Sequence, residues 1–264
     1  MMTDITGIKG DLYQTSVIMK YELIKHFRSK KMYIFLVLLA VILGLTLAVC
    51  IGWGFPAHSE GFMSISVMTC VFVVLVAAIL FAATALVSEF EERTALLIFT
   101  RPVRKITILF GKFLASALIT SVMIAIYFAI FGVICQIEYG EIPGSIVSAI
   151  GVAIAAGLCY VGMAFLLSSF AKKGSTASIL TLIVNLVIIS LVSGLITVAT
   201  NGDMILWFMP DFSLGALYTA LDLNAFNGIT GDSIAKVGTS IGVLLAWCFG
   251  TLAASYAIFR KREF

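Results

Sequence analysis

The side chains whose types and spacing could do chemistry gather between residues 88 and 112, a stretch with three Glu and five Lys or Arg. Inside it lies an apolar island, residues 95–100, which is entered through Thr94 and closed by Arg101 and Pro102. Thr is a good N-cap and Pro stops a helix, so the island is expected to form a short helix with an apolar face. The chemistry is noncovalent, because such a helix held just outside a membrane either lies on lipid or fits into a groove on a partner.

Patterns for catalysis and for metal binding are missing. Gly111-Lys112 is followed by Phe and has no Gly five residues before it, so it is not the phosphate-binding motif G-x-x-x-x-G-K-[ST]. The histidines, His26 and His58, are isolated from each other, and the five Cys form no C-x-x-C pair. We therefore expect no catalytic residue, no metal site and no cofactor in this chain.

Composition indicates the class of protein. Hydrophobic residues make up 61% of the 264 residues and charged residues 12%, whereas an ordinary soluble domain carries about 25% charged residues. Crossing the hydrocarbon core of a bilayer takes roughly 20 apolar residues, and runs of that kind occur at 32–51, 65–87, 108–134, 146–167, 177–198 and 237–259. The predicted fold is an all-α polytopic membrane protein, with an N-terminal segment (1–31) followed by a domain of six transmembrane helices (32–264).

The distribution of basic residues predicts the orientation of these helices. If the N-terminus is inside, every Lys and Arg except Lys236 falls on the inner side. Positive charge is retained on the cytoplasmic side during insertion, so both termini and the charged loop (88–112) are predicted to be cytoplasmic, on a plasma (inner) membrane. The long outer loop (199–236) is expected to hold one or two short helices that dip into the outer leaflet, and it could either gate a pathway or cap the bundle.

The N-terminal segment between residues 12 and 31 has the spacing of an amphipathic helix. At 100° per residue, one broad face collects Leu12, Tyr13, Val17, Met19, Tyr21, Leu23, Ile24 and Phe27. The opposite face collects Gln14, Thr15, Glu22, Lys25 and His26, while Ile18 and Lys20 break the pattern. A helix lying in the cytoplasmic interface is favoured over a plain basic flank, because the apolar face continues into the first span without a loop.

Polar residues inside the apolar runs supply the candidates for a transport pathway. The runs are interpreted as free of Asp, Glu, Lys, Arg and His, and Pro is missing, which argues against a proton-coupled pump and against broken helices that coordinate an ion. Asn185, Tyr127 and Tyr160 are the candidates for lining a pathway. The alternative is that these side chains form hydrogen bonds between helices.

The charged loop resembles the cytoplasmic loop of ABC-2 type transporter permeases. The spacing from Thr94 to Pro102, and from Pro102 to Gly111-Lys112, matches the pattern of that family. Arg93 stands where the family usually has Gly, and Ala95 where it usually has Leu. The wider chain also agrees, with a helix before the first span, six spans, a long last outer loop and a basic tail.

The resemblance implies that residues 94–100 are a coupling helix, which docks into a cleft of a separate ATP-binding subunit. Leu96, Leu97 and Phe99 would be its apolar anchors, between Thr94 and Pro102 at its ends. Rim charges that tune the choice of partner would be Glu89, Glu91, Glu92, Arg93, Arg101 and Arg104. ATP and Mg would be held by the partner subunit, and a second permease copy, identical or paralogous, would complete the complex in the lipid bilayer, with no nucleic acid. The resemblance further implies export as the direction of transport.

Other classes of function remain open from the residues alone. The apolar face of residues 96–99 could lie on lipid instead of a partner. A passive channel or a membrane scaffold would need no ATP-binding subunit. An intramembrane enzyme is disfavoured, because Ser and Tyr in the spans have no His, Asp or Lys beside them to act as a base. The transported substrate is not indicated by any motif.

Overall fold

The computed structural model describes residues 8–54, 56, 58–88, 104–142, 144–200, 206–223 and 234–261. Within them the structure has helices and turns but no strand, and six of its helices are long and apolar enough to cross a membrane. This confirms the all-α, polytopic membrane fold. The spans are α2 (Lys30–Trp53), α3 (Ser59–Phe81), α6 (Lys105–Tyr139), α7 (Ile146–Phe170), Gly174–Ala199, and α12 (Val237–Lys261).

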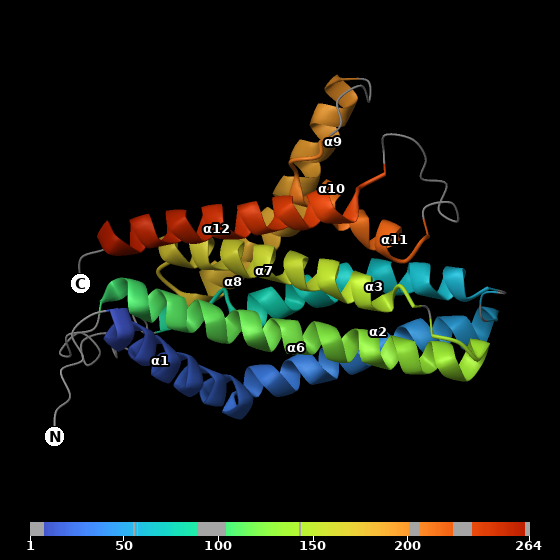
Figure 1. Cartoon of the computed structure of the whole chain (residues 1–264), viewed down its shortest axis with the longest axis horizontal. Helices are drawn as coiled ribbons and strands as arrows, with labels where there is room; N and C mark the ends of the chain where they lie inside the picture. Colours follow the sequence, from blue (N-terminus) through green and yellow to red (C-terminus); the bar gives the residue numbers. More distant parts are fainter. Residues whose placement is uncertain are drawn as a thin grey trace.

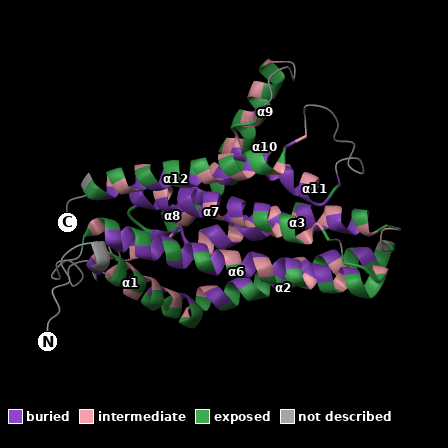
Figure 2. Ribbon diagram, in the orientation of Figure 1, coloured by how far each residue is buried: buried purple, intermediate pink, exposed green. Residues whose placement is uncertain are grey.

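The helix α7 forms the centre of the bundle. It packs against α3, α6 and α12, and Figure 2 shows it buried along most of its length. Small residues allow these close approaches. A Cβ built on Gly162 would lie 2.6 Å from the Thr251 Oγ1 of α12, and one built on Gly157 would lie 2.8 Å from Ile124 of α6. Close backbone contact through Gly is the usual way in which transmembrane helices pack.

The predicted N-terminal helix is present as α1 (Ile8–Arg28), and it lies along the first part of α6 (Figure 1). It is followed almost at once by α2, with Ser29 between the two helices. The extended conformation of Ser29 interrupts the helix and turns the chain into the first span. The apolar residues Leu12, Tyr13 and Tyr21 of α1 are exposed, as they are expected to be if this side of the helix lies on lipid.

The second span ends earlier than the sequence predicts. The apolar run was expected to stay helical to residue 87, but α3 ends at Phe81 and the chain continues through turns from residue 82 to residue 86. Ala-rich sequence favours a helix, so local propensity does not end it. The cause is tertiary, because side chains of α6 donate hydrogen bonds to two backbone carbonyls of this segment, those of Phe81 and Ala85.

The fifth span is helical without a gap, but its backbone hydrogen-bonding pattern changes partway along. It consists of α8 (Gly174–Ile183), a π-helical turn η1 (Val184–Ile188) and α9 (Ile189–Ala199). Asn185 lies in the π-helical turn and is buried, whereas no residue of α9 is buried. Figure 1 shows α9 leaving the bundle at a steep angle.

The segment before the last span contains the short helices α10 (Pro210–Leu214) and α11 (Ala216–Ala220). Leu214, Leu217 and Ala220 are buried against the ends of α7 and α12. Hydrogen bonds fix the segment, since the Trp247 Nε1 donates to the Phe208 carbonyl at 2.8 Å and the Ser148 Oγ donates to the Ala220 carbonyl at 2.8 Å. The described part of this loop therefore covers the end of the bundle as a cap does.

The contact between α7 and α12 yields a first prediction. In Gly162→Ala, the new Cβ would also lie 3.0 Å from the Cys248 carbonyl, so the two helices must separate. Overpacking of this kind costs about 1–3 kcal/mol, and the melting temperature of the purified protein in detergent is expected to fall by several degrees. Gly151→Ala is the matched control on the same helix, because nothing lies within 4 Å of its Cβ position. Equal melting temperatures for the two variants would contradict this packing.

Candidate functional site

The candidate docking residues fall mostly outside the described part of the chain. Glu89, Glu91, Glu92, Arg93, Thr94, Leu96, Leu97, Phe99, Arg101 and Pro102 lie outside the described residues, as does the predicted coupling helix. Arg104 is described, and it is the N-cap of α6. The geometry that the structure gives is therefore that of the two stems of the loop, which are the end of the second span and the start of α6.

The stem on the α6 side is tied to both ends of the chain. The Arg104 Nη1 lies 2.9 Å from the Asp11 Oδ2 at the start of α1. The Lys105 Nζ donates to the Arg260 carbonyl near the end of α12 at 3.4 Å. The Arg104 side chain is 72% exposed, so its ion pair is screened by water and contributes little to stability.

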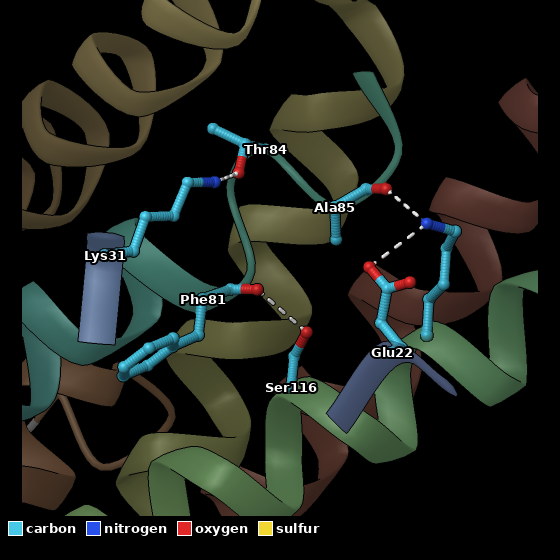
Figure 3. A network of polar contacts seen from close by, with 7 residues as sticks. Glu22, Lys31, Phe81, Thr84, Ala85 and Ser116 are labelled. Carbon is cyan, nitrogen blue, oxygen red and sulfur yellow. Dashed lines mark hydrogen bonds and ion pairs between the residues drawn. The ribbon is translucent and has the colours of Figure 1, made fainter. Parts of the chain in front are cut away.

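The stem on the α3 side is buried, in contrast to an ordinary loop. The side chains of Ala82, Ala83, Leu86 and Val87 are almost completely buried. The Ser116 Oγ of α6 donates to the Phe81 carbonyl at 2.9 Å, and the Lys31 Nζ, from the start of α2, donates to the Thr84 hydroxyl. Figure 3 shows these partners converging on the turn from different helices. Buried backbone carbonyls that leave a helix must find other donors, and here they find them on α6.

A buried ion pair completes this arrangement. The Lys112 Nζ lies 3.3 Å from the Glu22 Oε1 of α1 and donates to the Ala85 carbonyl at 2.9 Å. The Lys112 side chain is only 1% exposed. We call Glu22, Lys31, Lys112 and Ser116 the polar cluster. It joins α1, α2 and α6 to the turn at residues 82–88, which is the α3-side stem of the loop.

The inward face of α1 differs from what its amphipathic pattern suggests. Glu22 and His26, assigned to the polar face, are buried against the bundle, while the apolar face is largely exposed. Ile18, which breaks the sequence pattern, lies on the inward side and packs against Gly111 of α6. A Cβ built on Gly111 would lie 2.7 Å from the Ile18 Cγ2, so Gly at this position lets the two helices approach each other.

His26 lies between α1 and the end of α3. Its ring contacts that of Phe81 edge-on, with centroids 5.6 Å apart, and its Nε2 is buried without a hydrogen-bond partner among the described residues. The pKa of His26 is lowered to about 4, chiefly by burial; Glu22 opposes this shift, and the positive charges of Lys31, Lys112 and Lys25 contribute to it. The imidazole is therefore neutral at physiological pH.

The three pathway candidates lie on different elements. On α6, the Tyr127 hydroxyl donates to the Ser66 carbonyl of α3 at 2.7 Å and also contacts the Thr69 hydroxyl. The Asn185 Nδ2 donates to the Thr181 carbonyl at 2.8 Å, whereas its Oδ1 has no partner among the described residues. Tyr160 is buried in α7. No hydrogen bond in the described residues joins any two of the three, and Tyr127 makes the interhelical bonds that the alternative interpretation anticipates.

Several residues of the polar cluster were not selected from the sequence. The interpretation that the apolar runs are free of ionisable side chains is wrong at Lys112, which falls inside the third run. Ser116 follows it by one helical turn. A charged residue inside an apolar run is itself a signal, because it requires a partner. The partner could not be identified, since Glu22 is distant in sequence and its face of α1 appeared to be the solvent side.

The prediction that patterns for catalysis are missing needs one correction, because a short pattern of that kind occurs in the last span, although without catalytic geometry. Residues 238–242 read Gly-Thr-Ser-Ile-Gly, which fits the hydrolase pattern G-x-S-x-G. In hydrolases that Ser stands on a sharp turn between a strand and a helix. Here all five residues lie within α12, and Ser240 is buried, so the pattern does not present a nucleophile.

Comparison with known proteins agrees with this architecture. The family model described as ABC-2 family transporter protein matches residues 56–257. A protein of Pseudomonas aeruginosa named "Probable ABC transporter permease protein NosY" is 25% identical over 209 residues, which cover 70% of this chain and 74% of that protein. The residues matched by the family model include the whole of α3, the charged loop and α6.

The buried imidazole predicts a pH dependence of stability. Because the pKa of His26 is lower in the folded protein than its ordinary value of 6.5, the unfolded chain binds the proton more readily. Stability is therefore full above pH 6.5 and is lost as the pH falls from 6.5 towards 4, by about 2 kcal/mol between pH 7 and pH 5. Melting temperatures in detergent should show this loss in the natural protein and much less of it in His26→Phe. The same pH dependence in both proteins would contradict the role of His26.

Proposed function

This chain belongs to the ABC-2 transporter family, and we propose that it is the membrane-spanning subunit of an exporter that is driven by a separate ATP-binding subunit. Membership in the family implies an ATP-binding partner. The sequence supports this division of labour, because it carries no phosphate-binding motif of its own. Export is the direction that the family resemblance implies.

One feature carries the proposal that the partner docks on the charged loop. An apolar island, with Leu96, Leu97 and Phe99 as anchors, stands among Glu, Lys and Arg residues in the loop between α3 and α6. Apolar anchors with a charged rim are typical of a protein interface rather than of a lipid surface alone. One stem of this loop is held by the buried polar cluster, and the other contacts α1 and α12 through exposed side chains.

The distribution of charge supports a cytoplasmic position for the loop. Basic residues of the described segments gather at the ends where α1 meets α2, α6 begins, α7 passes into α8, and α12 ends. They include Lys25, Arg28, Lys30, Lys31, Arg104, Lys105, Lys172, Lys173 and Arg260. Lys236, before α12, lies at the opposite end. Under the positive-inside rule, this distribution supports the proposal that both termini are cytoplasmic. A plasma-membrane location is part of the same proposal.

In this proposal, ATP binding by the partner moves the loop, and the rigid spans pass the motion to an opening in the membrane. A second copy of the chain, or a paralogue, would complete the pathway. The exposed surface of α9, which has no buried residue, is compatible with such a neighbour and equally with lipid. The substrate is the part of the function that the site does not define.

Docking through the apolar island can be tested with Phe99→Asp. A carboxylate in an apolar cleft must be desolvated without a partner, which costs several kcal/mol, so co-purification of the ATP-binding subunit should fall at least tenfold. Phe99→Leu is the control, because it keeps an apolar side chain of similar reach. Both variants would be co-expressed with the subunit and compared by pull-down and by ATP turnover.

The opposite outcome has a clear meaning. If Phe99→Asp still co-purifies with the ATP-binding subunit and turnover remains coupled to the membrane chain, the island does not dock there. The apolar face would then lie on lipid, as the alternative interpretation holds.

A further inference from the structure

We propose that Lys112, through its ion pair with Glu22, is a positioning residue that makes α1, α6 and the loop stem at residues 82–88 move as one body. This inference rests on the proposed function, in which an ATP-binding subunit displaces the loop. It adds the route by which that displacement enters the membrane helices.

The first observation is that residues 82–88, the segment that joins α3 to the charged loop, are held by contacts with the bundle. Residues 82–88 follow directly from α3 and lead into the loop, and their side chains are mostly buried. The turn is not stabilised by its own backbone alone, since the Ala85 carbonyl accepts from Lys112 and the Phe81 carbonyl accepts from Ser116. A segment held in this way transmits displacement instead of absorbing it.

The second observation is that a single cation binds two elements at once. The Lys112 Nζ contacts the Glu22 carboxylate of α1 at 3.3 Å and the Ala85 carbonyl at 2.9 Å. The charge itself sits on α6. In Figure 3, dashed lines join one side-chain nitrogen to both the Ala85 carbonyl and the Glu22 carboxylate. Moving the stem away from α6 would therefore break the hydrogen bond of a buried ammonium to the Ala85 carbonyl, and moving α1 would break its ion pair with Glu22.

The third observation concerns energy. Breaking a buried ion pair by removal of one partner is strongly destabilising, whereas replacing both partners by apolar residues of similar volume is often neutral or stabilising. Stability alone therefore does not require this pair. The exposed pair Arg104–Asp11 already links α1 to α6 at the surface. The buried pair adds a contact with the stem through Ala85, and its electrostatic attraction is not screened by water.

The double variant Glu22→Leu with Lys112→Met separates positioning from folding, because it removes both charges together. Its melting temperature is expected to fall only slightly, because the Ala85 carbonyl loses one donor while no charge is left unpaired. Its binding of the ATP-binding subunit is expected to stay close to that of the natural chain. The turnover of ATP that depends on the membrane chain should fall at least fivefold. Lys112→Arg, which keeps the charge and the donors, should retain at least half of that turnover. Lys20→Met, at an exposed position on α1, is the matched Lys→Met control and should not alter it.

The outcomes are distinguishable. Natural turnover in the double variant would overturn the inference and leave the pair with a structural role only. If the double variant fails to fold, Glu22→Gln decides, because it keeps the side-chain shape and leaves the contact of Lys112 with Ala85. Reduced turnover with intact binding supports positioning, and unchanged turnover contradicts it. If the natural chain neither binds the subunit nor changes its turnover, the proposed function itself is wrong, whatever the variants do.

Discussion

A positive charge buried at one end of the bundle must have partners close by, and much of the local structure follows from that requirement. Lys112 is almost fully buried on α6, so a carboxylate has to reach it, and Glu22 does so from α1. This draws the polar side of α1 inwards and leaves its apolar side exposed. The same ammonium donates a hydrogen bond to the Ala85 carbonyl, and this stabilises the turn that follows α3.

The spans divide into a packed group and an open one. Around α7, glycines allow α12 and α6 to approach at distances that no other residue would permit. The fifth span, by contrast, leaves the bundle after the π-helical turn at Asn185. Within a membrane, apolar side chains gain little when contact with lipid is replaced by contact with another helix, so a span that is exposed to lipid is stable. A transporter built in this way has a rigid centre and one helix that is free to meet lipid or another subunit.

The sequence predicted the class, the six spans and the first helix well, because long apolar runs and the amphipathic spacing of residues 12–31 depend only on local order. The sequence-based prediction ended the second span six residues later than α3 ends in the structure. The residues after Phe81 do not break a helix by themselves, and the side chains that donate to this segment come from α6. The sequence-based prediction also assigned Glu22 and His26 to the outer side, because a polar face normally meets water. Both differences have one origin, which is that Lys112 and Glu22 are far apart in sequence but paired in the fold.

The account's central claim is that the loop stem, α1 and α6 form one mechanical unit at the end of the bundle where the ATP-binding subunit would dock. Hydrogen–deuterium exchange of the natural chain in complex with that subunit, with and without a non-hydrolysable ATP analogue, tests it most directly. The account predicts that amide exchange changes together in residues 82–88 and in residues 19–28 of α1. A change confined to residues 82–88, with α1 unaffected, would contradict it.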